Sequence, residues 1–399
     1  MAQDFTVDRN SSKWVLGSDG FLKEYANDEA AIEFNADGSY KGVLVEPEST
    51  NNILYSNTFS NSYWRKQNLT VSSESNSKFG TIYKVTDSND GLDTYHFLGR
   101  ISNIVSTGTY NRSVFVKKGT LTKVIVNSAG VLSPETSTSI NGRILVDLTD
   151  GSIVDSNNAD NISVREYGDD WYRISYSRTI SNTPADGRFS IVLCSNDATD
   201  AINDQTYQGD GTGYLYVFGA QLEESPIATS YIPTTTGAVT RLKDDIFFTN
   251  ASSVIGQSQG TLFVEVDWQL TSGATQWIFS INDSTFTNRV LLLKSAVDEY
   301  IDARVYKSGS AVWNEPYTIS LSGIQKIALT YSATGGKMYI NGSEVLDDAN
   351  DLSFSAGTLT DVDFGQSATS SGQANMWIRA VALFTTRLSD AECEALTTL

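Results

Sequence analysis

The chain has 399 residues, of which 40% are apolar, 11% aromatic and 19% charged, and its formal net charge is −19. That length suits at least two domains, each able to bury its own core. The acidity excludes nucleic acid and anionic membrane surfaces as favoured partners, because both repel a negative protein and no basic stripe offsets the charge. Abundant Ser, Thr, Asn and Gly among Val, Tyr and Phe favour an all-β fold.

The first residues, MAQDFTVDRNSSKW, lack the basic and apolar regions of a signal peptide, and no run of 18 apolar residues follows anywhere. We therefore expect a protein made in the cytoplasm, with no signal peptide and no membrane insertion. We treat residues 1–55 as a segment of their own, ahead of the first domain.

Residues 56–235 predict a first β-sandwich. Short runs of β-branched and aromatic residues recur there between clusters of Gly, Asn, Asp and Ser, which is the spacing of a sandwich. In Arg173–Ser177, apolar and polar residues alternate, as in a strand with one wet face. The predicted strands are Arg112–Lys118, Lys123–Val126, Arg143–Leu148, Trp171–Ser177, Phe189–Cys194 and Gly213–Phe218.

Residues 236–249 predict a linker and residues 250–399 a second sandwich, because Pro233, three threonines and Gly237 interrupt any regular pattern before new strands begin. Ile327–Tyr331 should pair with Lys337–Ile340, and Asn341-Gly342 should turn that strand back into the next. Near the end, Ser389 and Glu392 have the spacing of a capping box, which predicts one short C-terminal helix.

Five runs within residues 5–241 stand out, namely Gly42–Asn57, Phe59–Trp64, Gly168–Arg173, Gly209–Gly213 and Phe218–Thr234. In sequence and in order they resemble a family of bacteriophage head spike and head fibre proteins. At Glu46–Ser49 the chain departs from the family, which carries an Arg before the Thr-Asn pair. The resemblance implies a virion location, a homotrimer, and docking through residues 1–55 onto the major capsid protein or another virion protein.

The second half has four characteristic runs, Gly260–Val266, Lys326–Tyr331, Met338–Gly342 and Val381–Glu392. These runs are similar to those of concanavalin A-like and laminin-G-like jelly rolls. The resemblance implies a fold and no particular ligand, because jelly rolls serve as lectins, adhesins, hydrolases and spacers.

Nothing in the sequence predicts a catalytic residue. The one histidine, His96, lies in a predicted strand and is interpreted as a satisfied surface or edge residue. Glu265 and Asp267 alternate as the paired carboxylates of jelly-roll glycosidases do, but that pattern needs a further Glu where this chain has Leu270. We interpret the two acids as solvent-facing.

Metal binding has weak support. Cys194 and Cys393, with one His, cannot build a closed zinc site. The acidic stretches Asp347–Asp351 and Asp197–Asp204 offer the oxygen ligands that calcium prefers, without EF-hand spacing. We therefore expect no cofactor, with Ca²⁺ as the ion that these loops would suit, and name no metal ligands.

Saccharide binding is the other open chemistry, since a sugar ring stacks on an exposed aromatic face while polar neighbours take its hydroxyls. The candidates are Trp313 and Tyr317, in a loop-like stretch, and Tyr207 beside Gln208. Core packing is the alternative for Trp313. It is the expectation for Trp64, Trp171, Trp268 and Trp377, which lie in strand-like or motif-matching runs.

Three functions follow from these observations. The first is a non-enzymatic capsid decoration or head fibre protein whose outer domains hold host-surface polysaccharide weakly, with many copies on one particle. The second is a tail-associated receptor-binding adhesin, and the third a polysaccharide depolymerase, which would need paired acids in a groove.

Overall fold

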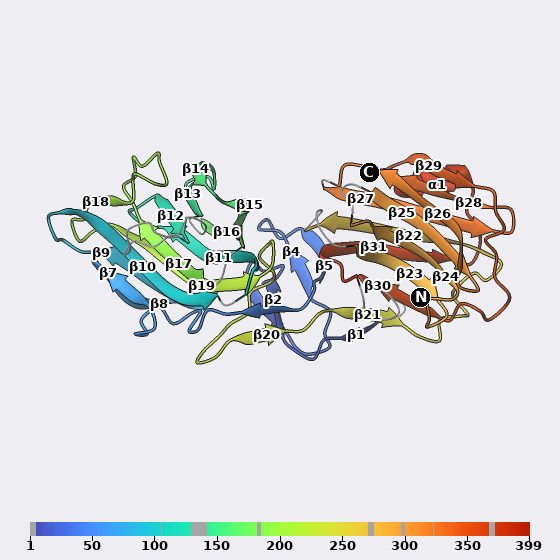
Figure 1. Ribbon diagram of the computed structural model, residues 1–399, viewed down its shortest axis with the longest axis horizontal. Coiled ribbons are helices and arrows are strands. Elements are labelled where there is room, and N and C mark those ends of the chain that lie inside the picture. Colours follow the sequence, from blue (N-terminus) through green and yellow to red (C-terminus); the bar gives the residue numbers. More distant parts are fainter. Residues whose placement is uncertain are drawn as a thin grey trace.

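The computed structural model describes residues 5–104, 106–128, 142–181, 185–269, 275–296, 300–321, 323–366 and 372–399. Two β-sandwiches lie side by side along the long axis of the molecule, and strands from the start of the chain lie between them (Figure 1). The predicted all-β class with one short C-terminal helix is confirmed.

The first sandwich consists of two antiparallel sheets. Its core contains side chains from both sheets, among them Val114, Ile174 and Leu193. One sheet has the order β14 (Ile153–Asn157), β13 (Arg143–Asp147), β12 (Lys123–Asn127), β17 (Ala185–Leu193), β10 (Asp93–Ile104), β18 (Thr206–Gln208), with β7 (Arg65–Gln67) also beside β10. The other sheet has the order β15 (Asp160–Glu166), β16 (Trp171–Ile180), β11 (Gly108–Lys118), β19 (Tyr214–Glu224), β9 (Gly80–Asp87), β8 (Leu69–Asn76).

The second sandwich has two seven-stranded sheets around a core that includes Leu262, Phe279 and Trp313. The first has the order β1 (Thr6–Asp8), β21 (Asp245–Phe248), β30 (Asp361–Phe364), β23 (Gln276–Asn282), β24 (Arg289–Lys294), β25 (Tyr300–Lys307), β26 (Ser310–Thr318). The second has the order β29 (Ser343–Asp348), β28 (Gly336–Ile340), β27 (Ile324–Ser332), β22 (Gln259–Trp268), β31 (Met376–Phe384), β5 (Tyr40–Val45), β4 (Ile32–Phe34).

Local sequence signals predicted their elements correctly. All six strands expected in the first sandwich are present. Strand β27 pairs with β28, and Asn341 and Gly342 both adopt positive φ in the turn to β29, as a tight hairpin requires. Ser389 is the N-cap of helix α1 (Asp390–Thr397), and the capping box with Glu392 is formed in both directions.

Residues 5–55 do not stand apart from the sandwiches, in contrast to the separate segment expected from the sequence. Strand β1 pairs with β21, and β5 pairs with β31, so the start of the chain completes both sheets of the second sandwich. The expected linker also contains strands, because β20 (Val239–Arg241) pairs with β6 (Ser49–Asn51) and β21 follows directly. Backbone pairing with distant strands carries no local sequence signal, which explains the difference.

The hairpin of β2 (Lys13–Leu16) and β3 (Leu22–Tyr25) packs against both sandwiches. Leu16 and Leu22 join an aromatic cluster of the first sandwich that contains Phe115, Trp171 and Phe218. Val15 and Tyr25 instead pack with Leu44 and Trp377 of the second sandwich. Because neighbouring strand residues face opposite sides, this short hairpin contacts both bodies at once.

A buried cluster of five charged side chains lies at the same junction. Lys13 Nζ is 2.6 Å from Asp244 Oδ2 and 3.0 Å from Glu46 Oε2. Arg9 Nη1 lies 2.8 Å from Asp244 Oδ1, and Arg241 Nη2 lies 3.6 Å from Glu46 Oε2. None of the five side chains is more than 2% exposed. We call these residues the junction cluster.

The junction cluster also binds the backbone of the loop that follows β19. The Ser230 N–H donates to Glu46 Oε1 at 2.8 Å. Close by, the Ser49 hydroxyl donates to Glu223 Oε1 at 2.6 Å. The cluster therefore ties together four segments that are far apart in the chain.

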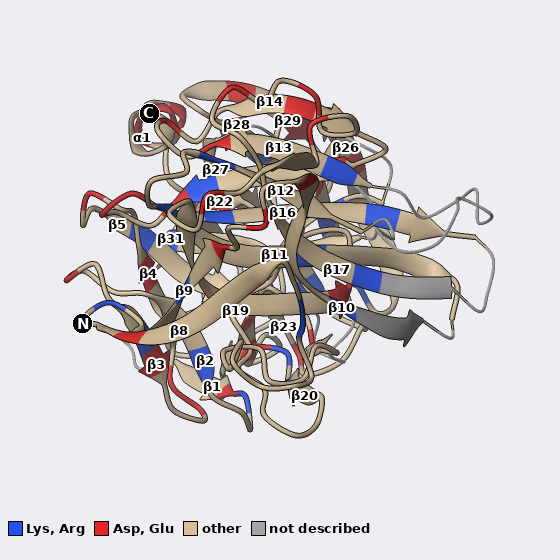
Figure 2. Ribbon diagram, turned by 90° about the vertical axis from the view of Figure 1, so that its left-hand side faces the viewer, with Lys and Arg blue, Asp and Glu red and all other residues tan. Residues whose placement is uncertain are grey.

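Charge on the rest of the molecule is dispersed. In the end-on view of Figure 2, Lys and Arg are interspersed with Asp and Glu along the strands and are not gathered in one stripe. Within the described residues, no helix is long and apolar enough to cross a bilayer.

Substituting Lys13→Met should destabilise the protein by about 3–5 kcal/mol, because it leaves Glu46 and Asp244 buried without their shared ammonium. The free energy of unfolding by guanidinium measures this. Lys337→Met is a matched control, since Lys337 also meets two carboxylates, Glu344 and Asp390, at a far more exposed site, where about 1 kcal/mol or less is expected. Equal losses in the two variants would contradict the importance of the junction cluster.

Glu46 should make the stability of the protein sensitive to acid. Burial alone would raise its pKa, but Lys13, Arg241 and the Ser230 N–H outweigh burial and lower the pKa of Glu46 to about 2 from a usual 4.5. Since the folded-state pKa is depressed, this stabilisation is present above pH 4.5 and is lost as the pH falls toward about 2. Denaturation curves across that window should show a shallower pH dependence for Glu46→Gln than for the unmodified chain.

Candidate functional site

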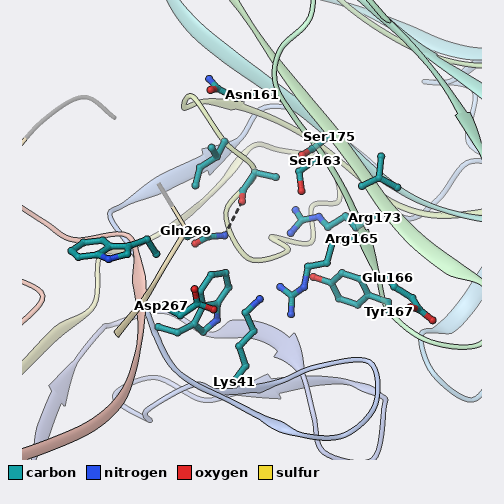
Figure 3. A pocket seen from close by; sticks show the side chains of 15 residues that line it. Lys41, Asn161, Ser163, Arg165, Glu166, Tyr167, Arg173, Ser175, Asp267 and Gln269 are labelled. Atoms are coloured by element: carbon teal, nitrogen blue, oxygen red, sulfur yellow. Dashed lines mark hydrogen bonds between the residues drawn. The ribbon is translucent and has the colours of Figure 1, made fainter. Parts of the chain in front are cut away.

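A pocket of about 510 Å³ lies between the two sandwiches. One wall comes from β15 and β16, another from β5, β31 and the end of β22, and the loop at Ile227 and Ala228 closes a third side. Its polar and charged lining residues are Lys41, Asn161, Ser163, Arg165, Glu166, Arg173, Ser175, Asp267 and Gln269, and most of them point toward its centre in Figure 3. The aromatic lining residues are Tyr167, Trp268 and Trp377.

Lys41 extends from β5 across the ring of Trp377, with Nζ 3.8 Å from the ring centroid. Figure 3 shows its side chain rising toward Arg165 and Asp267. Burial and the neighbouring Arg165 guanidinium lower the pKa of Lys41 to about 8, although Glu33 and Asp267 partly offset them. The ring contact holds the ammonium in place without neutralising it.

Arg165 is the second cation of the pocket, and it is paired. Its Nη1 lies 2.9 Å from Glu33 Oε1, while the other oxygen of Glu33 accepts from Trp377 Nε1 at 2.6 Å. Burial opposes the charge of Arg165, but the Glu33 carboxylate outweighs it and raises the pKa of Arg165. Glu33 is thus fully committed behind the pocket wall.

Arg173 and Gln269 each use only part of their hydrogen-bonding capacity. Arg173 donates to Thr229 O at 2.7 Å and to the Ser113 hydroxyl at 3.0 Å, while its buried Nε has no hydrogen-bond partner among the described residues. Gln269 Nε2 donates to Ala228 O at 3.2 Å, shown as a dashed line in Figure 3, and its buried Oε1 accepts no hydrogen bond from the described residues. The Ser163 hydroxyl and the Asp267 carboxylate, also in the lining, offer a donor and an acceptor to a small polar ligand.

The aromatic saccharide candidates lie elsewhere and apart from one another. Trp313 is 2% exposed in the core of the second sandwich, and Tyr317 is half-buried against that core. Tyr207 and Gln208 are on β18 of the first sandwich, whereas Trp313 and Tyr317 are on β26, at opposite ends of the molecule in Figure 1. Core packing, the alternative considered for Trp313, agrees with its burial, and Trp64, Trp171, Trp268 and Trp377 are also buried.

Tyr207 and Gln208 are engaged within the first sandwich. The Tyr207 hydroxyl donates to Asp87 Oδ2 at 3.0 Å, and Gln208 Nε2 donates to Gly91 O at 3.1 Å. His96 was interpreted from the sequence as a surface or edge residue, and this was wrong. It is fully buried, with Nδ1 2.6 Å from Asn68 O and Nε2 3.1 Å from Tyr207 O, because β10 lies inside its sheet.

The paired acids of β22 have different surroundings. Glu265 forms an ion pair with Arg379, at 2.7 Å from Nε, and does not line the pocket. Of these two acids, Asp267 is the one that lines the pocket. Leu270 lies outside the described residues.

Within the described part of the chain, no three His, Cys, Asp or Glu side chains come together as metal ligands. The acidic loops proposed for calcium use their carboxylates internally. Asp351 accepts from Ser353, and Asp200 and Asp204 accept from backbone N–H groups of their own loop. Cys194 and Cys393 are free and buried.

The sequence analysis missed the residues that shape this pocket. Lys41 and Arg165 are 124 residues apart in the chain, and Arg165 and Asp267 are 102 residues apart. Each belongs to a strand whose sequence resembles that of an ordinary half-exposed strand. Trp377 was assigned to a core, correctly, but its role beside Lys41 has no local signal. The run Gly42–Asn57 that begins next to Lys41 was noted only for its resemblance.

No protein-family model matches the chain, and no curated protein is similar to it. Among solved structures, it is similar to the Ruminococcus gnavus IT-sialidase CBM40 bound to α2,3-sialyllactose, at 17% identity and a TM-score of 0.31 over 37% of this chain and 87% of that one. It is also similar to domain 4 of AbnA, a GH43 arabinanase from Geobacillus stearothermophilus in complex with arabinotriose. The sequence identity there is 15% and the TM-score 0.34, over 43% of this chain and 82% of that one. A SAP-like pentraxin from Limulus polyphemus has 14% identity and a TM-score of 0.30, over 36% of this chain and 70% of that one. These likenesses concern the β-fold alone.

Substituting Trp313→Ala should lower the free energy of unfolding by about 3–5 kcal/mol, because it leaves a cavity in the second core. Trp277→Ala, at a half-buried tryptophan of the same sandwich, is the control and should cost clearly less. Chemical denaturation measures both. Unchanged stability in Trp313→Ala would return Trp313 to the list of ligand-binding candidates.

Proposed function

We propose that this protein is a non-enzymatic structural and adhesion protein of a bacteriophage particle, of the capsid decoration or head fibre type, and that it holds saccharides between its sandwiches. The observation that carries the saccharide part is the polar pocket of about 510 Å³ at the junction. Pockets of a few hundred Å³ suit a ligand of one or two sugar rings.

The lining chemistry supports a polyhydroxylated ligand. Sugar hydroxyls donate and accept at once, and Asp267, Gln269 and Ser163 bring acceptors and donors to one space. Binding through one such pocket is expected to be weak. Many copies on one particle would raise the effective affinity without any further contact.

The particle part of the proposal rests on the resemblance of residues 5–241 to head spike and head fibre proteins. Two stable sandwiches joined through a buried junction suit a projection that must keep its shape outside the cell. In this proposal residues 1–55 dock on the capsid protein, with homotrimeric assembly, using surfaces of strands that are already folded.

The depolymerase alternative has less support. A glycosidase needs two carboxylates flanking the bond that it cleaves. Asp267 and Glu166 both line the pocket, but Figure 3 shows the Glu166 side chain directed away from Asp267. Glu265 lies outside the lining and is paired with Arg379. Incubation of the protein with host capsule, followed by measurement of new reducing ends, should give no release of sugar.

Location on purified particles tests the structural part. We expect an antibody against residues 250–399, carrying gold, to label the head in electron micrographs. Label confined to the tail tip would instead support the receptor-binding adhesin, and unlabelled particles would contradict both. Light scattering of the purified protein should give the mass of a trimer.

A further inference from the structure

The ammonium of Lys41 forms no ion pair with a carboxylate of the described residues. Its Nζ lies 3.8 Å from the centroid of the Trp377 ring, and among the described residues no hydrogen bond or ion pair accompanies this cation–π contact. The carboxylate best placed to neutralise it, Glu33, is already shared between Arg165 and Trp377 Nε1. A half-buried cation of this kind gains most from an anion that arrives from outside.

The surroundings of Lys41 favour an anion further. Arg165 and Arg173 line the same pocket, and Figure 3 shows the ends of Lys41 and Arg165 pointing toward one another across it. Two cations held close together repel each other, which is one cause of the lowered pKa of Lys41. A carboxylate between them would remove that repulsion.

The rest of the lining shows that the ligand is more than a simple anion. Asp267 brings a carboxylate to the pocket. It would repel the oxygens of phosphate or sulfate but would accept hydroxyl protons. The complementary ligand carries one negative charge at one end and hydroxyl groups at the other.

A neutral sugar fits the pocket less well. Neutral sugars gain much of their affinity by stacking on an open aromatic face. Tyr167, Trp268 and Trp377 are each less than one-tenth exposed, so none offers such a face here.

We propose that the pocket binds an acidic saccharide residue, with Lys41 and Arg165 holding the sugar carboxylate and with Asp267 accepting from its hydroxyls. This inference rests on the proposed saccharide-binding function and narrows it to uronic and sialic acid types of sugar.

The test compares Lys41→Met with Lys84→Met in the full-length chain. Methionine keeps the apolar stem over the ring and removes the charge. Lys84 is the matched control, because its Nζ also lies 3.8 Å from a ring centroid, that of Tyr214, away from the pocket. Saturation-transfer NMR and calorimetry would measure binding of glucuronic acid, N-acetylneuraminic acid and neutral glucose.

The unmodified chain and Lys84→Met should bind one or both acidic sugars more tightly than glucose. Lys41→Met should weaken that binding by about tenfold or more, the effect of losing a charge-assisted hydrogen bond. Acidic sugars that bind equally well to Lys41→Met would overturn the inference and leave the proposed function standing. Binding of glucose alone would do the same, whereas no binding of any saccharide would overturn both the inference and the saccharide part of the proposed function.

A second measurement needs no variant, in case Lys41→Met does not fold. The sugar carboxylate is charged throughout the neutral range, while Lys41 loses its proton as the pH rises through about 8. The charged groups that face Lys41 are Arg165, Arg379, Glu33 and Asp267. Binding of the acidic sugar to the unmodified chain should therefore weaken as the pH rises through that value. Affinity independent of pH there would contradict a role for Lys41.

Discussion

The arrangement of this molecule depends on the burial of three cations and two carboxylates at its junction. Lys13 joins Glu46 to Asp244, Arg9 binds Asp244, and Arg241 binds Glu46. Removing ions from water is costly, and their mutual attraction offsets that cost only when every partner is in place. Since the partners come from the segment after β1 and the start of β2, from the residue after β5, and from the end of β20 and the segment that follows it, these parts of the chain must assemble together.

That requirement positions the two sandwiches. Each has its own apolar core, and neither core extends into the other. The β2–β3 hairpin packs against both, with Leu16 on one body and Val15 on the other. Gln269, at the end of β22, also donates directly to Ala228 O of the first body. The pocket lies between the two bodies, with β15 of the first sandwich and β22 of the second in its walls.

The pocket and the junction cluster both remove cations from water, but the chain compensates these cations differently at the two sites. At the junction every buried cation has a carboxylate from the chain. In the pocket Arg165 has Glu33, but Lys41 lies over an aromatic ring. This difference between two cationic sites of one protein is the reason for assigning a ligand to the second.

The sequence by itself determined what local chemistry decides: the all-β class, the strands of the first sandwich, the turn at Asn341-Gly342 and the helix capped by Ser389. Strand periodicity and turn or cap residues act over a few positions, so they can be read from neighbours in the chain. Only the tertiary structure decided that β1 and β5 complete the second sandwich, that His96 and Trp313 are buried, and that Lys41 meets Arg165. These outcomes depend on which strand edges pair and which faces meet across more than a hundred residues, and no local pattern encodes such distances.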